Sequence, residues 1–249
     1  YHKLKWDRRE TNKGRKLAIP IPDIISLSIF KQKNKIETKK SIFEIFQPPC
    51  SYKTLVVNMN RFAKLAMYLF CFIMNLNRNE AHPIKHTDST DIPVCLNKNA
   101  RRHKTMDLLA SWGHSGKGLF YGLKLHMTTD LKRRILAIRF TSAKVHDKTV
   151  FLKLNQGLYG LFAADAAYIS KKLQEEFYEE NKRILFAKPR KNMKKIMTWW
   201  QDMLYKTRMT IEFNFRSLKM FYGLITSMPR TVNGYLANYI YSLLAYVIA

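Results

Sequence analysis

The first part of the chain carries apolar residues at helical spacing, from about residue 20 to residue 76. Ser41 and Ser51 stand just before two of the apolar runs, where a serine side chain can cap the first turn of a helix. Pro48-Pro49 lies between these runs, and proline interrupts a helix. We therefore predict a helical N-terminal region over residues 1–80, with the binding of DNA ends as its candidate role.

The pattern changes near residue 81. Short runs rich in β-branched and aromatic residues follow, joined by polar or glycine-containing connections, which is typical of strands in hairpins. Farther on, short strand-like runs alternate with helical ones. The expected strands are 86–95, 118–127, 135–141, 159–164 and 184–187, and the expected helices begin at Asp147, at Ser170, near Trp199 (to about Tyr222) and after Pro229. This order predicts an α/β domain over residues 81–249, with a mixed sheet flanked by helices.

The charge balance points to a polyanionic partner. The chain has 44 Lys and Arg against 18 Asp and Glu, a formal net charge of +26. A charge of this size attracts polyanions, so nucleic acid is the first candidate partner. A ribosomal type of RNA binder and a peripheral membrane protein share this composition.

No secretory or membrane segment is expected. Residues 1–17 are basic, but no apolar run follows them as it would in a secretory leader. The most apolar stretch, residues 63–76, is about 14 residues long, below the roughly 20 that span a bilayer, which favours a buried core helix. The three cysteines are scattered singly, which fits a reducing compartment. We expect a cytoplasmic protein.

Three carboxylates in strand-like runs are candidates for chemistry. Asp88 and Asp91 lie in the first expected strand, and Asp165 ends an apolar one. A buried carboxylate is costly unless it is paired or binds a cation. Asp165 has the plainer alternatives of capping a turn or pairing with a basic side chain. Because an offset of three reverses the face of a strand, only one of Asp88 and Asp91 can serve the same site as Asp165.

A polar stripe marks the expected helix 199–222. Tyr205, Arg208, Glu212 and Lys219 lie at offsets 0, 3, 7 and 14, which places them within roughly 60° of arc on one helix face. A solvated salt-bridged face is the ordinary explanation. The remaining helix positions are largely apolar, so we favour a stripe that lines a site.

Separated carboxylates together with cations suit phosphodiester chemistry. Two Mg²⁺ ions held by carboxylates can activate the attacking oxygen and stabilise the leaving one. Arg208 and Lys219 would then hold flanking phosphates. Two basic segments, 98–104 and 182–195, add further candidates for contacts with the DNA backbone, although a charge run is usually a solvated face. The residues chosen from them are Arg101, Arg102, Lys188, Arg190 and Lys191.

Five motifs in order resemble the DDE transposases of bacterial insertion sequences. They are D-S-T-D-I-P-V-C from Asp88, F-Y-G-L-K-L-H from Phe120, V-H-D from Val145, A-D-A-A-Y-I-S-K from Ala164 and K-P-R-K-N-M-K from Lys188. The chain looks most similar to insertion-sequence family 982, within the wider family-4-like group. That group also has a Y-x2-R-x3-E-x6-K signature, which Tyr205, Arg208, Glu212 and Lys219 match at every spacing. The resemblance covers about residues 84–249. Two departures are Ala166-Ala167, where relatives have Lys-Gly, and Phe213–Phe215 after the glutamate.

The resemblance implies an RNase H-like fold and an enzyme that cuts and joins double-stranded DNA. Asp88, Asp165 and Glu212 match the catalytic, metal-binding acids; the implied cofactor is Mg²⁺, with Mn²⁺ as a substitute. The implied substrates are the terminal inverted repeats and a target, engaged by a homodimer in a bacterial cytoplasm near the nucleoid. The alternatives are an inactive remnant that only binds DNA and an RNase H-like nuclease that cleaves without joining.

Overall fold

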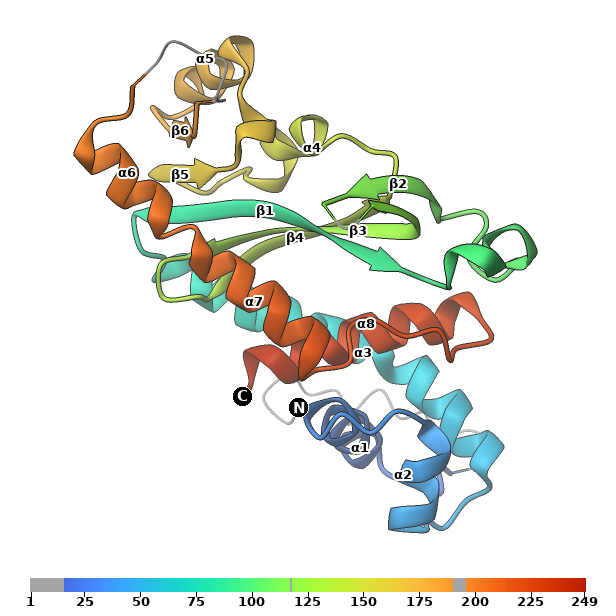
Figure 1. Ribbon diagram of the computed structural model, residues 1–249. Coiled ribbons are helices and arrows are strands. Elements are labelled where there is room, and N and C mark those ends of the chain that lie inside the picture. Colours follow the sequence, from blue (N-terminus) through green and yellow to red (C-terminus); the bar gives the residue numbers. More distant parts are fainter. Residues whose placement is uncertain (1–15, 117, 190–195) are drawn as a thin grey trace.

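The computed structural model describes residues 16–116, 118–189 and 196–249 and has a mixed α/β architecture (Figure 1). The helices are α1 (Ile21–Lys33), α2 (Lys39–Phe46), α3 (Tyr52–Asn79), α4 (Asp147–Leu154), α5 (Lys171–Glu179), α6 (Trp199–Lys206), α7 (Met209–Met220) and α8 (Val232–Val247). The strands are β1 (Ile84–Pro93), β2 (Ser111–Ser115), β3 (Gly118–Asp130), β4 (Ile135–Ser142), β5 (Leu161–Ala164) and β6 (Ile184–Ala187). Two short 3₁₀ helices are η3 (Asn97–Arg102) and η4 (Ala166–Tyr168). The α/β prediction, with one curled mixed sheet flanked by helices, is confirmed.

The sheet has the order β2-β3-β1-β5-β6, with β4 also paired to β3. Strands β1 to β4 pair antiparallel, whereas β1, β5 and β6 run parallel, which is the expected mixture of hairpins and crossovers. Strand β2 was not predicted, because its sequence Ser-Trp-Gly-His-Ser has no strand-like run of apolar residues. Its pairing with the first half of β3 holds it in the sheet.

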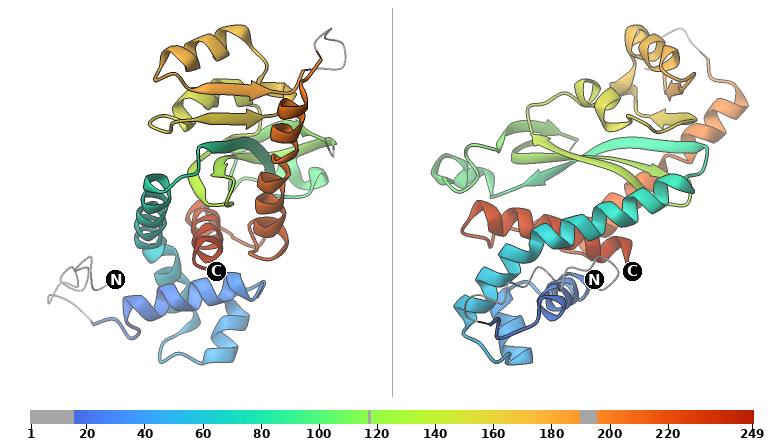
Figure 2. Two further views of the ribbon diagram at one scale, coloured as in Figure 1. Left: turned by 90° about the vertical axis from the view of Figure 1, so that its left-hand side faces the viewer. Right: turned by 180° about the vertical axis from the view of Figure 1, so that it is seen from behind.

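The two faces of the sheet are covered by different helices. Figure 2 shows α3, α7 and α8 on one face, while α4 and α5 lie on the other side near β5 and β6. Successive residues of β1 follow this division. The His86 ring contacts Thr207 Oγ1 at 2.8 Å, between α6 and α7, whereas Thr87 lies beside the Asn155 side chain that follows α4.

The N-terminal helices share their core with the sheet. Helices α1 and α3 pack against α8, and one buried cluster joins these helices to β1, β3 and α7. Two tyrosines of α8 bond across the cluster: Tyr235 donates to the Val94 carbonyl and Tyr241 to the Met59 carbonyl, each at 3.0 Å. The change from helices to strands therefore falls between residues 79 and 84, but the buried core continues across it.

The helix starts test the capping predictions. Ser51 caps α3 and Ser170 caps α5, as expected. The prediction that Ser41 caps a helix was wrong, because Thr38 is the cap of α2 and its hydroxyl accepts a hydrogen bond from the Ser41 amide at 3.0 Å. The side chain of Asp147 makes no capping bond at the start of α4 and instead contacts Lys124.

The expected helix 199–222 divides into α6 and α7 at Thr207. The Thr207 hydroxyl donates to the Leu204 carbonyl at 2.6 Å, and the Thr210 hydroxyl donates to the Thr207 carbonyl at 2.9 Å. Hydroxyl groups that bond back to the preceding turn distort a helix. Arg208 consequently stands at the junction, beside β1.

Helix α3 contains the apolar stretch 63–76 within 28 residues. Among the described residues it is the one helix that by length and composition could cross a membrane, with a mean hydropathy of 1.2 and 33% of the apolar window buried. Its inner side packs against α1 and α8. Its outer side leaves Tyr68, Phe72 and Leu76 exposed.

Candidate active site

Two of the predicted acids follow the same pair of strands. β1 and β5 pair in parallel up to Thr87 and Ala164, and Asp88 and Asp165 come directly after that last pair. The two carboxylates therefore lie side by side at the centre of the sheet. Asp88 Oδ1 accepts a hydrogen bond from its neighbouring amide at 2.8 Å, and Asp165 Oδ1 accepts one from the first amide of η4 at 2.7 Å.

Arg208 connects the third acid to this pair. Its Nη1 lies 2.7 Å from Asp88 Oδ2, and its Nη2 lies 2.5 Å from Glu212 Oε1. One guanidinium group thus stands between the carboxylates of β1 and α7. The Arg208 side chain is 14% exposed and that of Glu212 is 51% exposed, so Glu212 is the solvent-facing member.

The environment of Asp88 disfavours its charge. Burial raises the pKa of Asp88 from 3.8 to about 6, and the nearby carboxylates of Asp165 and Asp147 add to the rise. Arg208 and the Ser89 amide act in the opposite direction, but burial dominates. A cation would be stabilised at this group of partly buried acids, whose charges the neighbouring cations offset only in part.

A pocket of about 250 Å³ opens at these acids. Its acidic lining residues are Asp88, Asp91, Asp147 and Asp165. The sequence marked Asp147 only as the start of a helix and as part of the V-H-D motif, not as a residue of the site. Its Oδ1 lies 3.2 Å from Lys124 Nζ and 3.7 Å from Nδ1 of the buried His126. Burial lowers the pKa of His126 to about 4, against the opposing effect of Asp147, so this imidazole is neutral near pH 7.

Strand alternation does not separate Asp91 from the pocket. The pairing of β1 with β5 ends at Thr87, so the later part of β1 has an open edge at that side. Asp91 reaches Lys219 of α7, with 2.9 Å between Oδ1 and Nζ. Asp91 therefore lines the pocket together with Asp88, but it is paired with a different cation. The preference for Asp88 as the first ligand stays a prediction.

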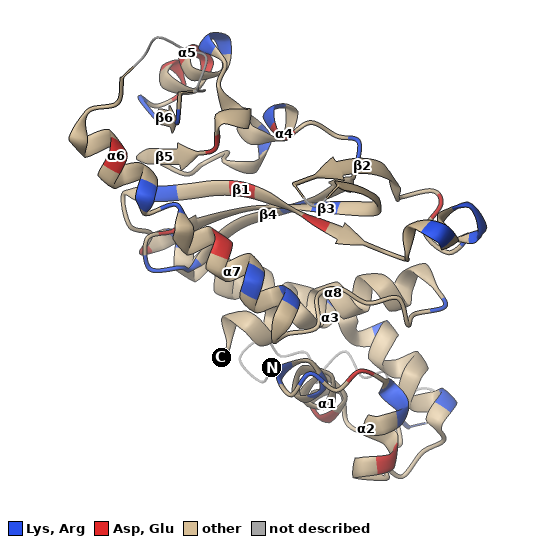
Figure 3. Ribbon diagram, viewed as in Figure 1, with Lys and Arg blue, Asp and Glu red and all other residues tan. Residues whose placement is uncertain are grey.

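The predicted DNA contacts fall into two places. At the site, two cations approach the Tyr205 ring: Lys188 Nζ lies 4.7 Å from the ring centroid and Arg208 Cζ lies 5.5 Å from it. Arg101 and Arg102 are exposed on η3, beyond the end of β1 and away from the acids (Figure 3). Arg190 and Lys191 lie outside the described residues.

The acids fit a magnesium site by their chemistry. Asp88, Asp165 and Glu212 offer the hard oxygen ligands that Mg²⁺ prefers. Within the described ranges no three acidic, histidine or cysteine side chains are already close enough together to hold a metal ion. Arg208 occupies the position between Asp88 and Glu212, so the guanidinium must turn away before these two acids can share an ion.

A family model described as "Transposase DDE domain" matches residues 78–229, more than half of the chain. The chain belongs to this family of DDE transposase domains. All three predicted acids lie inside the matched segment. Membership of insertion-sequence family 982 and a bacterial source stay predictions.

Among solved structures, the chain is similar to the piggyBac transposase in a synaptic complex with hairpin DNA. The TM-score is 0.55 at 9% identity, over 98% of this chain and 68% of that one. At this identity the similarity shows a shared fold. No curated protein matches the chain.

Proposed function

We propose that this DDE transposase cuts and joins DNA at the terminal inverted repeats of an insertion sequence, using Asp88, Asp165 and Glu212 as its catalytic acids. The observation that carries the proposal is the position of Asp88 and Asp165 side by side at the ends of β1 and β5, with Glu212 joined to them through Arg208. Their location inside the matched DDE domain supports the same roles.

The three acids would hold divalent cations, Mg²⁺ or Mn²⁺. Such ions, when bound, lower the barrier to phosphodiester cleavage by activating the attacking oxygen and stabilising the leaving one. Asp88 must lose its proton to act as a ligand, so the affinity for the divalent cation should increase as the pH rises through about 6.

Arg208 is a candidate for exchanging its two carboxylate partners for a DNA phosphate. In this structure its guanidinium neutralises Asp88 and Glu212. If these acids held cations, the guanidinium would be free to bind a DNA phosphate, for which its planar fork is well suited. Lys188 and Tyr205 lie beside it, where they can contact the adjoining part of the strand.

The DNA partner is supported by the net charge of +26 and by the hairpin DNA named in the piggyBac complex. Two transposon ends must be brought together for joining, which favours a homodimer. The test uses purified protein, Mg²⁺ and a duplex that ends in the element's inverted repeat, with nicked and joined products separated on a denaturing gel.

Both products are expected, and both should disappear without a divalent cation. Nicking without joining would instead identify a nuclease, and the absence of both products, with DNA binding retained, would identify an inactive remnant. Either result overturns the proposal.

A further inference from the structure

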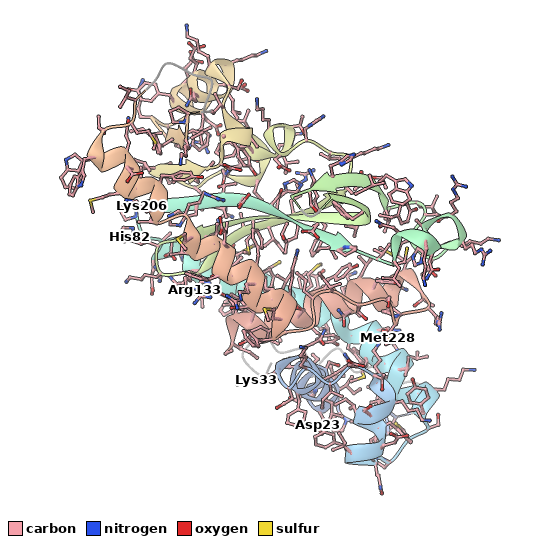
Figure 4. All side chains as sticks on the ribbon, viewed as in Figure 1. Asp23, Lys33, His82, Arg133, Lys206 and Met228 are labelled. Atoms are coloured by element: carbon pink, nitrogen blue, oxygen red, sulfur yellow. The ribbon has the colours of Figure 1, made fainter. Side chains whose placement is uncertain are left out.

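A second basic pocket lies away from the acids, where the N-terminal helices meet the start of α8. Its volume is about 460 Å³. It is lined by Lys31 of α1, by residues 37–40 around the start of α2, and by Tyr52, Val56 and Asn60 of α3. Residues 226, 228–231, 234 and 238, before and within α8, complete the lining. Met228, labelled in Figure 4, is one of its walls. A smaller cavity of about 170 Å³ adjoins it and shares Lys31, Glu37 and Met228 with it.

Two desolvated lysines reach this pocket. Lys31 is 9% exposed, and its ammonium group makes a hydrogen bond of 3.3 Å to the Gln32 side chain. Lys39 donates to Asn60 Oδ1. Burial lowers the pKa of each lysine to about 8, and the charge of Lys31 lowers that of Lys39 further. Two ammonium groups are thus held near one another with incomplete neutralisation, which is unfavourable unless an anion joins them.

The charge around the pocket is strongly positive. Its charged lining residues are Lys31, Lys39, Lys40, Arg230 and Glu37, four cations against one carboxylate. Glu37 raises the pKa of Lys31, but less than burial lowers it. Lys40 also lies 3.7 Å from Glu44, in a highly exposed pair that contributes little. Tyr52 is the remaining titratable group of the lining.

Two helix N-termini add to the positive electrostatic potential of the pocket. Helix α2 begins at Lys39 with Thr38 as its cap, and α8 begins at Val232 with Thr231 as its cap. Both caps line the pocket. The first backbone N–H groups of a helix have no partners within the helix and carry partial positive charge, so they are suited to bind an anion.

We infer that this pocket binds a phosphate group of the DNA backbone, at a position separate from the catalytic acids. The inference rests on the proposed function in one respect, that DNA is the partner. A phosphate ion free in solution has the same chemistry, so the experiment must distinguish the two sources.

The first measurement is the affinity for repeat-end DNA as a function of salt, in an Asp165→Asn background so that no cleavage interferes. The double variant Lys31→Gln, Lys39→Gln should bind about 10-fold more weakly and reduce the salt slope by about 1 to 2. The matched control is Lys33→Gln, Lys64→Gln, which removes the same charge from exposed positions of α1 and α3 outside the cavity. The control should change the affinity by no more than about 2-fold. Equal losses in both pairs, or no loss in either, would overturn the inference.

The second measurement excludes a merely structural effect. Because the lysines are desolvated, their replacement should raise the melting temperature of the free protein while reducing the further rise that DNA produces. A variant that melts lower, with the DNA-induced rise unchanged, contradicts the inference.

The third measurement identifies the source of the phosphate. DNA should protect Lys31 and Lys39, but not Lys33, from amine acylation, and inorganic phosphate at the same phosphate concentration should not. Protection by inorganic phosphate alone assigns the pocket to the free ion and overturns the DNA assignment. Cleavage activity is not read in any of these measurements, so a failed transposase and a failed phosphate pocket give different results.

Discussion

The substitution Asp88→Asn tests the electrostatics of the site through stability. The pKa of Asp88 is raised from 3.8 to about 6, so the folded protein binds this proton more tightly than the unfolded chain does. Below about pH 3.8 both states are protonated and the group has no effect. As the pH rises from 3.8 through 6, the unfolded chain ionises first, and the folded state loses stability relative to it.

Each tenfold difference in proton affinity between the folded and unfolded states corresponds to about 1.36 kcal/mol. Ionisation of Asp88 therefore lowers the free energy of unfolding by about 3 kcal/mol above pH 6. Asparagine resembles the protonated acid in shape and charge, so Asp88→Asn should be more stable than the parent at pH 8. At pH 5 about half of this advantage is expected. The gap in the free energy of unfolding between Asp88→Asn and the parent should therefore widen by roughly 1 to 2 kcal/mol between pH 5 and pH 8.

Urea unfolding of both proteins across this pH range, without divalent cations, measures the gap. The control is Asp202→Asn, which removes a carboxylate of α6 that is 39% exposed and paired with Lys206 at 2.7 Å. Asp202→Asn should change the free energy of unfolding by less than about 1 kcal/mol, because an exposed ion pair contributes little. A gap for Asp88→Asn that stays constant, or that narrows as the pH rises, would refute the conclusion that desolvation of Asp88 outweighs its ion pair with Arg208.

Two further predictions concern the backbone before β5 and the exposed acid of α7. Gly160→Ala should destabilise the protein by more than about 1 kcal/mol, because Gly160 has a φ of +104° and an added Cβ would lie 2.3 Å from the Pro83 carbonyl oxygen; an unchanged melting temperature would contradict this. Glu212→Gln should change stability by less than about 1 kcal/mol, since the side chain is 51% exposed, yet it should abolish cleavage of repeat-end DNA. Full cleavage by this variant would remove Glu212 from the catalytic acids.

Local patterns predicted most of the secondary structure, because they report local physics. The strand 184–187 agrees with β6 residue by residue, and Ser51 and Ser170 cap the helices that follow them. The features that the sequence did not predict depend on contacts between residues far apart in the chain. β2 exists through its pairing with β3, and the break at Thr207 lies where His86 of β1 contacts that hydroxyl.

The candidate site shows the same limit. Spacing alone placed Arg208 and Glu212 one helical turn apart, where they do meet. The pairing of Arg208 with Asp88 joins residues 120 positions apart in sequence and depends on the fold. Asp147 was missed as a site residue because its sequence neighbourhood indicates only a helix start. The packing of α4 against β3 brings it to the pocket.

The most direct test of the central claim is the rate at which Asp165→Asn cleaves DNA carrying the terminal inverted repeat in Mg²⁺, measured beside Asp202→Asn. Asparagine keeps an oxygen that can accept the Ala166 amide hydrogen bond, so the turn at η4 should be preserved while the charged ligand is lost. The account predicts that Asp165→Asn binds the DNA and melts like the parent but cleaves at least about 1,000-fold more slowly, whereas Asp202→Asn cleaves at the parental rate. Cleavage by Asp165→Asn at the parental rate would contradict the assignment of Asp165 to the catalytic centre.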